Sequence, residues 1–152
     1  MRLRPCRAAD LDALAEIDRA CFAPGIAYTR EELAAFVRRR GARTWVAGEG
    51  EEVAGFLVAQ PESRETLHIV TLDVVAAWRR QGVGSLLMEA AEQWAAKRGL
   101  RTVTLETAED NLPAHQFYLA RGYLPRDRVK HYYADGTDAW VMVKPLTPPG
   151  SL

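Results

Sequence analysis

Cysteine is scarce in this chain of 152 residues, which contains only Cys6 and Cys21. Two cysteines are too few for a disulfide framework or a typical zinc site, so we expect reduced thiols and no metal. Cys21 falls on the apolar stripe of the first predicted helix and is expected in the core. No apolar run approaches the roughly 18 residues that span a bilayer, and the first residues, MRLRPCRAADLD, become charged before a secretory signal could form. These absences predict a cytoplasmic protein with no membrane partner.

An excess of charge of either sign is also missing, because 20 Lys and Arg residues balance 20 Asp and Glu residues. Nucleic-acid-binding domains typically carry a basic excess, so we expect no nucleic acid partner. Apolar residues make up 48% of the chain and charged residues 26%, which is typical of a globular protein. We expect one domain over residues 1–146, followed by a flexible tail at residues 147–152.

Hydrophobic periodicity predicts an alternation of strands and helices. Residues 1–5 and 66–75 have the pattern of strands, residues 44–60 that of a hairpin, and residues 83–98 that of a long amphipathic helix. The full predicted order is strand, two helices, three strands, helix, strand, helix and one or two final strands. A strand–helix–strand unit implies a right-handed parallel crossover, whereas hairpins are antiparallel. The fold class is therefore α/β with a mixed sheet.

A glycine motif, Arg79-x-x-Gly82-x-Gly84, lies between a predicted central strand and the long helix. A dinucleotide-binding loop would need a third glycine where Leu87 stands, and a mononucleotide loop would need a lysine before Ser85. The free N–H groups of a first helical turn, together with arginines, suit a pyrophosphate. Alternatively, the glycines only ease a tight strand-to-helix turn.

Two segments together resemble the GNAT superfamily of acetyl-CoA-dependent N-acetyltransferases. They are VVAAWRRQGVGSLLM (residues 74–88) and LETAEDNLPAHQFYLARGY (residues 105–123). The resemblance extends over roughly residues 1–146 and implies the GNAT fold. In that fold the mixed central sheet is splayed between strands 4 and 5 and flanked by about four helices.

Within the superfamily, the chain is most similar to protein N-terminal α-amino acetyltransferases, including the ribosomal-protein alanine acetyltransferases. The spacing of Glu106, Asn111 and Tyr118 and the segment HYYADGTDAWVM (residues 131–142) carry this likeness.

The resemblance implies a binding site for acetyl-CoA. Backbone N–H groups of the glycine loop would hold the coenzyme A pyrophosphate, and Arg79 and Arg80 add positive charge beside it. The preceding strand would pair with the pantetheine arm through Leu72 and Val74, and Asn111 and Tyr118 would meet the coenzyme from the opposite side. The N–H groups of the loop belong to Gln81, Gly82, Val83, Gly84 and Ser85.

The same resemblance makes Glu106 the general base and Tyr118 the general acid. Asp73 is the alternative base, and His68 and His131 are candidates for relaying protons to solvent. Without the resemblance, Glu106 is equally a strand-edge carboxylate in an ion pair, and Tyr118 a packing residue of a helix whose Phe117 points toward the core.

The acceptor is predicted to be a primary amine, favouring the N-terminal α-amino group of a protein or peptide. Tyr28, Tyr132 and Tyr133 are the candidate substrate-binding residues, with one of the tyrosine pair facing the groove. A small-molecule amine acetyltransferase and a non-catalytic acyl-CoA-binding module are the alternatives. The oligomeric state is left open between monomer and homodimer.

Overall fold

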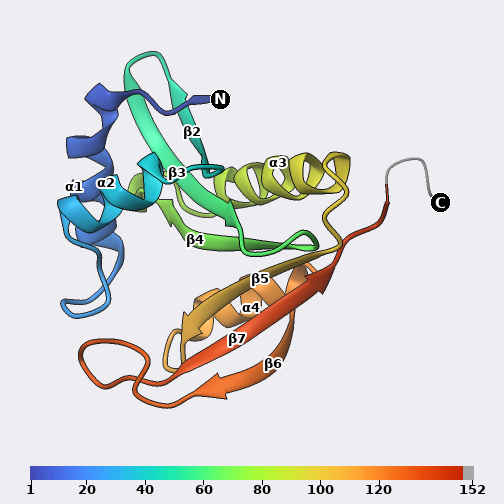
Figure 1. The fold of residues 1–152 in the computed structure, drawn as a ribbon. Helices are drawn as coiled ribbons and strands as arrows, with labels where there is room; N and C mark the ends of the chain where they lie inside the picture. Colours follow the sequence, from blue (N-terminus) through green and yellow to red (C-terminus); the bar gives the residue numbers. More distant parts are fainter. Residues whose placement is uncertain (149–152) are drawn as a thin grey trace.

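The computed structural model describes residues 1–148, so residues 149–152 of the predicted tail lie outside the described part of the chain. The element order agrees with the one expected from the sequence, with both final strands present (Figure 1). The strands are β1 (Arg2–Pro5), β2 (Arg43–Glu49), β3 (Glu52–Pro61), β4 (Thr66–Val74), β5 (Thr102–Ala108), β6 (Leu124–Val129) and β7 (Ala139–Pro145). The helices are α1 (Leu11–Cys21), α2 (Arg30–Arg38), α3 (Val83–Lys97) and α4 (Leu112–Ala120), with short 3-10 turns at Ala8–Asp10 and Ala76–Trp78.

All seven strands form one mixed sheet in the order β1-β2-β3-β4-β5-β7-β6. β4 and β5 pair in parallel, as the crossover through α3 requires, and every other pair is antiparallel. Helices α1 and α2 pack on one face of the first four strands, and α3 packs on the other. The predicted mixed α/β fold with four flanking helices is therefore confirmed.

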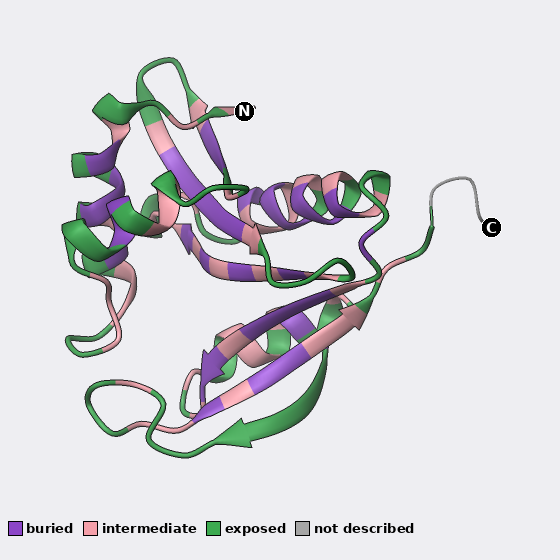
Figure 2. Cartoon of the chain, viewed as in Figure 1, coloured by how far each residue is buried: buried purple, intermediate pink, exposed green. Residues whose placement is uncertain are grey.

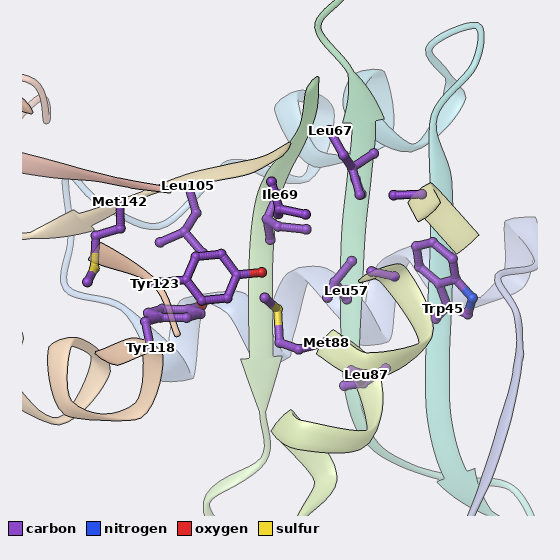
Figure 3. Packing of buried hydrophobic residues seen from close by; sticks show 14 of the residues in the cluster. Trp45, Leu57, Leu67, Ile69, Leu87, Met88, Leu105, Tyr118, Tyr123 and Met142 are labelled. Atoms are coloured by element: carbon purple, nitrogen blue, oxygen red, sulfur yellow. The ribbon is translucent and has the colours of Figure 1, made fainter. Parts of the chain in front are cut away.

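The main core lies between α3 and the sheet and continues under both halves of it. Leu87 and Met88 of α3 are fully buried and lie against β2–β4, and Figure 2 shows the buried stripe along this helix. Tyr118 and Tyr123 lie on the other side of β4 in the same cluster (Figure 3). Leu87, whose size argued against a dinucleotide-binding loop, is thus a core residue.

The feature that creates the site is the divergence of β4 from β5. Their pairing covers only Thr66↔Thr102, Leu67↔Val103 and His68↔Thr104. Just beyond His68, Val58 of β3 pairs with Thr71 and Ala59 with Ile69, so Val70 is an extra, bulged residue. A bulge bends its strand and increases the local twist. β4 therefore turns away from β5, and the sheet opens into the V that Figure 1 shows.

Glu92 of α3 joins the two halves of the sheet near the apex of the V. Its carboxylate accepts hydrogen bonds from Tyr123 Oη at 2.8 Å, Lys144 Nζ at 2.9 Å and Arg121 Nη2 at 3.2 Å. Arg121 and Tyr123 follow α4, and Lys144 is on β7. One buried carboxylate thus ties α3 to the half of the sheet that carries β5–β7.

Strand β6 is the element that the sequence indicated least. All of its residues are exposed, and its register with β7 shifts between Pro125 and Asp127. It is an edge strand with no buried face, so it shows no alternation of apolar and polar residues.

None of the helices within residues 1–148 combines the length and the apolar character needed to cross a membrane.

Candidate active site

A cleft of about 1450 Å³ fills the V between β4 and β5. Its walls come from four other places as well: the α1–α2 connection, the loop before α3, the first two turns of α4 and the loop between β6 and β7. Segments far apart in the sequence therefore converge on one open space. It is lined by Glu106 and Tyr118, the predicted base and acid, and by the three tyrosines predicted to bind the substrate.

The loop before α3 has the backbone of an anion-binding site. Arg80 and Gly82 have left-handed backbone angles, with φ of 62° and 82°. The first bond of the helix runs from Leu86 N–H to Gly82 O at 3.0 Å, so the N–H groups of the preceding turn have no acceptor within α3. Successive N–H groups in such a conformation form a concave anion-binding nest.

Gly84 has a different role from Gly82. A Cβ added at Gly84 would lie 3.3 Å from Phe117 Cζ and 3.7 Å from Val74 Cγ2, whereas one at Gly82 would meet nothing within 4 Å. Gly82 supplies the left-handed turn, and Gly84 allows α4 to approach α3 closely. The glycines therefore ease a tight turn and also leave N–H groups free at the cleft.

The residues predicted to bind the coenzyme are brought together, with one exception. Gln81 does not line the cleft, and its side chain donates to Ala77 O at 3.1 Å. Arg79 donates from Nε to Val74 O at 3.2 Å and lies along the cleft wall. The lining contains Leu72, Val74, Arg79, Arg80, Gly82, Val83, Gly84, Ser85, Asn111 and Tyr118.

The prediction that Cys21 is a core residue is wrong. Cys21 is half-buried and lines the cleft, with its thiol donating to Val74 O at 3.5 Å and Arg79 Nη2 lying 3.7 Å from Sγ. It ends α1 beside Val74, in the part of β4 that is not paired with β5. Burial, and to a smaller extent the negative charge of Asp73, raises the pKa of this thiol above its usual value.

Glu106 is held at the cleft by two donors. His68 Nε2 lies 2.7 Å from Glu106 Oε1, and Tyr132 Oη donates to the same oxygen at 3.2 Å. The Glu106 side chain is 17% exposed, so this is a partly buried pair and not a surface ion pair with Lys or Arg. Oε2 makes no hydrogen bond to any described residue.

His68 connects Glu106 to the loop between β3 and β4, because its Nδ1 lies 3.9 Å from Glu62 Oε1 and Glu62 is half exposed. Burial lowers the pKa of His68, but the hydrogen bond and charge of Glu106, with the charge of Glu62, raise it further, so the net pKa is above its usual value. His131, the other histidine considered, does not line the cleft and bonds to Asp138 and Gly136 instead.

Tyr118 is a buried tyrosine whose ring packs edge-on against Phe117 and Tyr123, at centroid distances of 5.1 and 5.6 Å. Burial, and then the charge of Asp73, raise the pKa of Tyr118 above its usual value, so the phenol is protonated at neutral pH. Phe117 packs against the main core, as the sequence predicted. Phe117 also lines the cleft, beside Gly84, because α4 lies against protein on two sides and consecutive positions are both covered.

Asn111 caps α4, its Oδ1 accepting Ala114 N–H at 3.2 Å. Its side-chain NH₂ group is left to donate into the cleft. The alternative base, Asp73, does not line the cleft: it is 1% exposed and faces α1. Its position excludes direct contact with a substrate in the cleft.

Tyr28, Tyr132 and Tyr133 lie together at the end of the cleft near Glu106. Both members of the tyrosine pair line it, their rings edge-to-face at 4.9 Å, because they belong to a loop and not to a strand with alternating faces. Burial raises the pKa of Tyr28 to about 12, with further contributions from Glu106 and Asp18. All three phenols are therefore neutral and able to donate at physiological pH.

The two loops that carry these tyrosines are joined to each other. Ala134 N–H donates to Gly25 O at 3.1 Å, and a Cβ on Gly25 would lie 3.0 Å from Asp135 Cβ. Gly25 has a φ of 87°, which also favours glycine. Phe22, Ile26 and Asp135 line the cleft here and were not predicted. The Pro24-Gly25 turn in the sequence was the available signal.

Comparison with known proteins agrees with this geometry. Residues 11–123 match the family described as the acetyltransferase (GNAT) family. An N-alpha-acetyltransferase of Sulfurisphaera tokodaii is 30% identical over 164 residues, covering 95% of this chain and 93% of that protein.

Two solved structures show how far the fold extends. Ard1 from Thermoplasma volcanium superposes with a TM-score of 0.87 at 25% identity, covering 96% of this chain and 97% of that one. The ribosomal-protein-S18-alanine N-acetyltransferase of Escherichia coli has a TM-score of 0.84 at 23% identity, covering 98% and 96%. The chain therefore belongs to the GNAT family of acetyltransferases, enzymes that take the acetyl group from acetyl-CoA.

Proposed function

We propose that this enzyme acetylates the free α-amino group at the N-terminus of a protein or peptide. The observation that carries the proposal is the pair of joined loops that form the wall of the cleft beside Glu106. The Tyr28 connection and the Tyr132–Tyr133 loop are hydrogen-bonded to each other through Gly25 and Ala134, beside Glu106. The extended N-terminus of a polypeptide is narrow enough to enter this space. A lysine on a folded surface is not, because the protein around it would collide with the two loops.

The cleft fits acetyl-CoA as the acetyl donor. The free N–H groups before Leu86 and the side chains of Arg79 and Arg80 suit an anionic pyrophosphate. The edge of β4 beyond His68 is not paired with β5, which leaves backbone groups near Leu72 and Val74 for an amide-containing arm. When bound, acetyl-CoA supplies the acetyl group as a thioester, which a neutral amine can attack.

Glu106 and Tyr118 supply the two proton-transfer groups of the reaction. An α-amino group has a pKa of about 7.7–8.0, against about 10.4 for lysine, so it needs only modest help to lose its proton. Glu106 Oε2 is free to accept that proton, because His68 and Tyr132 hold Oε1. Tyr118 Oη holds the proton that the departing sulfur requires, since its pKa is raised.

The names of the relatives support the same acceptor. The Sulfurisphaera tokodaii protein and a Sulfolobus acidocaldarius protein, 27% identical over 157 residues, are both N-alpha-acetyltransferases. The Escherichia coli structural neighbour is a ribosomal-protein-S18-alanine N-acetyltransferase.

Thiol release with matched peptides tests the proposal. We expect turnover of peptides with free N-termini, and none of the same peptides blocked at the N-terminus but carrying an internal lysine. Glu106→Gln should lower kcat about 100-fold or more, the range of a general base. Tyr118→Phe should lower it less, because a thiol of pKa about 8.5 is already a fair leaving group.

Glu109→Gln is the matched control, since Glu109 pairs with Arg128 outside the cleft and its loss should leave kcat unchanged. Turnover of polyamines in preference to any peptide would indicate a small-molecule acetyltransferase instead. Tight coenzyme A binding with no turnover at all would indicate a binding module.

A further inference from the structure

Three polar side chains are buried directly behind the acceptor end of the cleft. Asp18 of α1 is fully buried, and Thr71 and Asp73 of β4 are 7% and 1% exposed. Asp18 Oδ2 accepts the backbone N–H of Tyr28 at 2.7 Å, and Thr71 Oγ1 donates to Asp73 Oδ1 at 2.5 Å. Thr71 Oγ1 also lies 3.4 Å from Asp18 Oδ1. The cluster therefore connects β4, through α1, to the segment that carries Tyr28.

The cluster contains two carboxyl groups and no cation. Among residues 1–148, no Lys, Arg or His side chain forms an ion pair or a hydrogen bond with Asp18 or Asp73. Asp73 Oδ2 is buried without any hydrogen-bond partner. Two adjacent carboxylates in such surroundings cannot both be ionised, because each lacks solvent and each repels the other.

Burial, and then the hydrogen bond and charge of Asp18, raise the pKa of Asp73 well above its usual value. Asp73 is therefore the neutral partner, and Asp18 is the one that accepts the Tyr28 N–H. The other titratable side chains around the pair are Cys21 of α1, Tyr28 itself and Tyr118 of α4, all of which are neutral at physiological pH. Two charged side chains also lie nearby. Arg79 contacts Cys21 Sγ, and the negative charge of Glu106 helps to raise the pKa of Tyr28.

We propose that Asp18 and Asp73 hold one proton between them and act together as a positioning element for the acceptor wall. The protonated Asp73 lets β4 lie beside the Asp18 carboxyl, and Asp18 fixes the backbone at Tyr28. Neither acid touches a substrate, because neither lines the cleft. The role in acceptor binding rests on the proposed function, whereas the shared proton does not.

The shared proton has a defined effect on stability. A carboxyl whose pKa is higher in the folded than in the unfolded state binds more protons when folded. Stability therefore falls as the pH rises from the unfolded pKa to the folded pKa. Asp73→Asn mimics the protonated acid and removes this loss. The melting temperature of Asp73→Asn should therefore exceed that of the wild type at neutral pH, and the difference should shrink as the pH falls toward 4, near the unfolded pKa.

Asp10→Asn is the matched control with the opposite sign. Asp10 also lies beside α1 but bonds to Arg4 at 2.8 Å, and this contact lowers the pKa of Asp10 to about 2. Its contribution to stability is present at neutral pH and is lost as the pH falls through that value. Asp10→Asn should therefore lower the melting temperature at neutral pH, where Asp73→Asn raises it.

Amide hydrogen exchange at Tyr28 tests the positioning directly. The wild type and Asp73→Asn should protect this N–H, while Asp18→Ala should expose it. Asp18→Ala should also raise the KM for a peptide by about tenfold, the scale of one lost hydrogen bond to a charged group, with the KM for acetyl-CoA unchanged. If Asp18→Ala does not fold, Asp18→Asn, which keeps an acceptor oxygen, should weaken the protection of the Tyr28 N–H without abolishing it.

The inference is overturned if carboxyl NMR shows Asp73 titrating near 4, or if Asp73→Asn shifts the melting temperature equally at all pH values. It is also overturned if Tyr28 exchange is unchanged in Asp18→Ala. A wild type that acetylates no peptide would overturn the proposed function, while the exchange and pH measurements would still decide the shared proton.

Discussion

Glu92 is expected to be among the most costly single side chains to remove, because its carboxylate joins the two halves of the sheet. Its side chain is 11% exposed and accepts hydrogen bonds from Arg121, Tyr123 and Lys144. Glu92→Ala leaves two cations and one buried phenol without their partner. Removing one member of a buried ion pair typically costs about 3–5 kcal/mol, because the remaining charge loses its compensation.

This cost converts into a measurable shift. For a domain of this size, 1 kcal/mol corresponds to about 2–4 °C in Tm, so Glu92→Ala should lower Tm by about 10 °C. Urea unfolding should show the same loss as a lower midpoint with an unchanged slope. Glu92→Gln keeps an acceptor for Tyr123 but no charge, so its cost should fall between those of the wild type and Glu92→Ala.

Glu89→Ala is the control on the same helix. Glu89 is exposed, and the hydrogen bond that it accepts, from Gln93 Nε2 at 3.1 Å, lies on the surface. Its loss should change the free energy of unfolding by about 0.5 kcal/mol or less. If Glu92→Ala comes within about 1 kcal/mol of this control, the tie between the two halves contributes little and the reasoning is refuted.

Two further substitutions test the cleft. Gly82→Ala places a side chain at a φ of 82° and should cost about 1–2 kcal/mol in stability, although the side chain meets no neighbour. The stabilisation by coenzyme A in a thermal-shift assay should also become smaller. An unchanged thermal shift would count against the anion-binding role of this turn. His68→Gln keeps a donor for Glu106 but removes the titratable ring. Because the pKa of His68 is raised in the folded state, the stability that His68 contributes is present below about pH 6.5 and is lost as the pH rises. The Tm of His68→Gln should therefore fall below that of the wild type at pH 6 and match it at pH 9, and a pH-independent difference would contradict this assignment.

Periodic burial explains which elements could be predicted. The long helix and the strand before it have buried faces, so their sequences follow the periods of 3.6 and 2. β6 is exposed along its whole length and left no such pattern. The direction of β5 followed from the crossover rule, which is independent of composition.

The site was predictable where spacing within one element decides it. Asn111 and Tyr118 lie seven positions apart around α4, and both line the cleft. Contacts between distant segments were not predictable, because they depend on how far β4 bends away from β5. Neither the bond from His68 to Glu106 nor the position of Cys21 on the cleft follows from spacing along the chain.

The bulge at Val70 also bears on a hazard common to β-proteins. A strand edge without a partner is a template for association with other chains, and proteins usually cover or charge such edges. Here the unpaired stretches of β4 and β5 face each other inside the V. The walls of the cleft prevent a strand of another chain from pairing with them. The amide groups of a bound molecule can hydrogen-bond to these free backbone groups. A break in the sheet that would favour aggregation on an outer edge therefore leaves, inside the molecule, backbone groups that are reserved for a ligand.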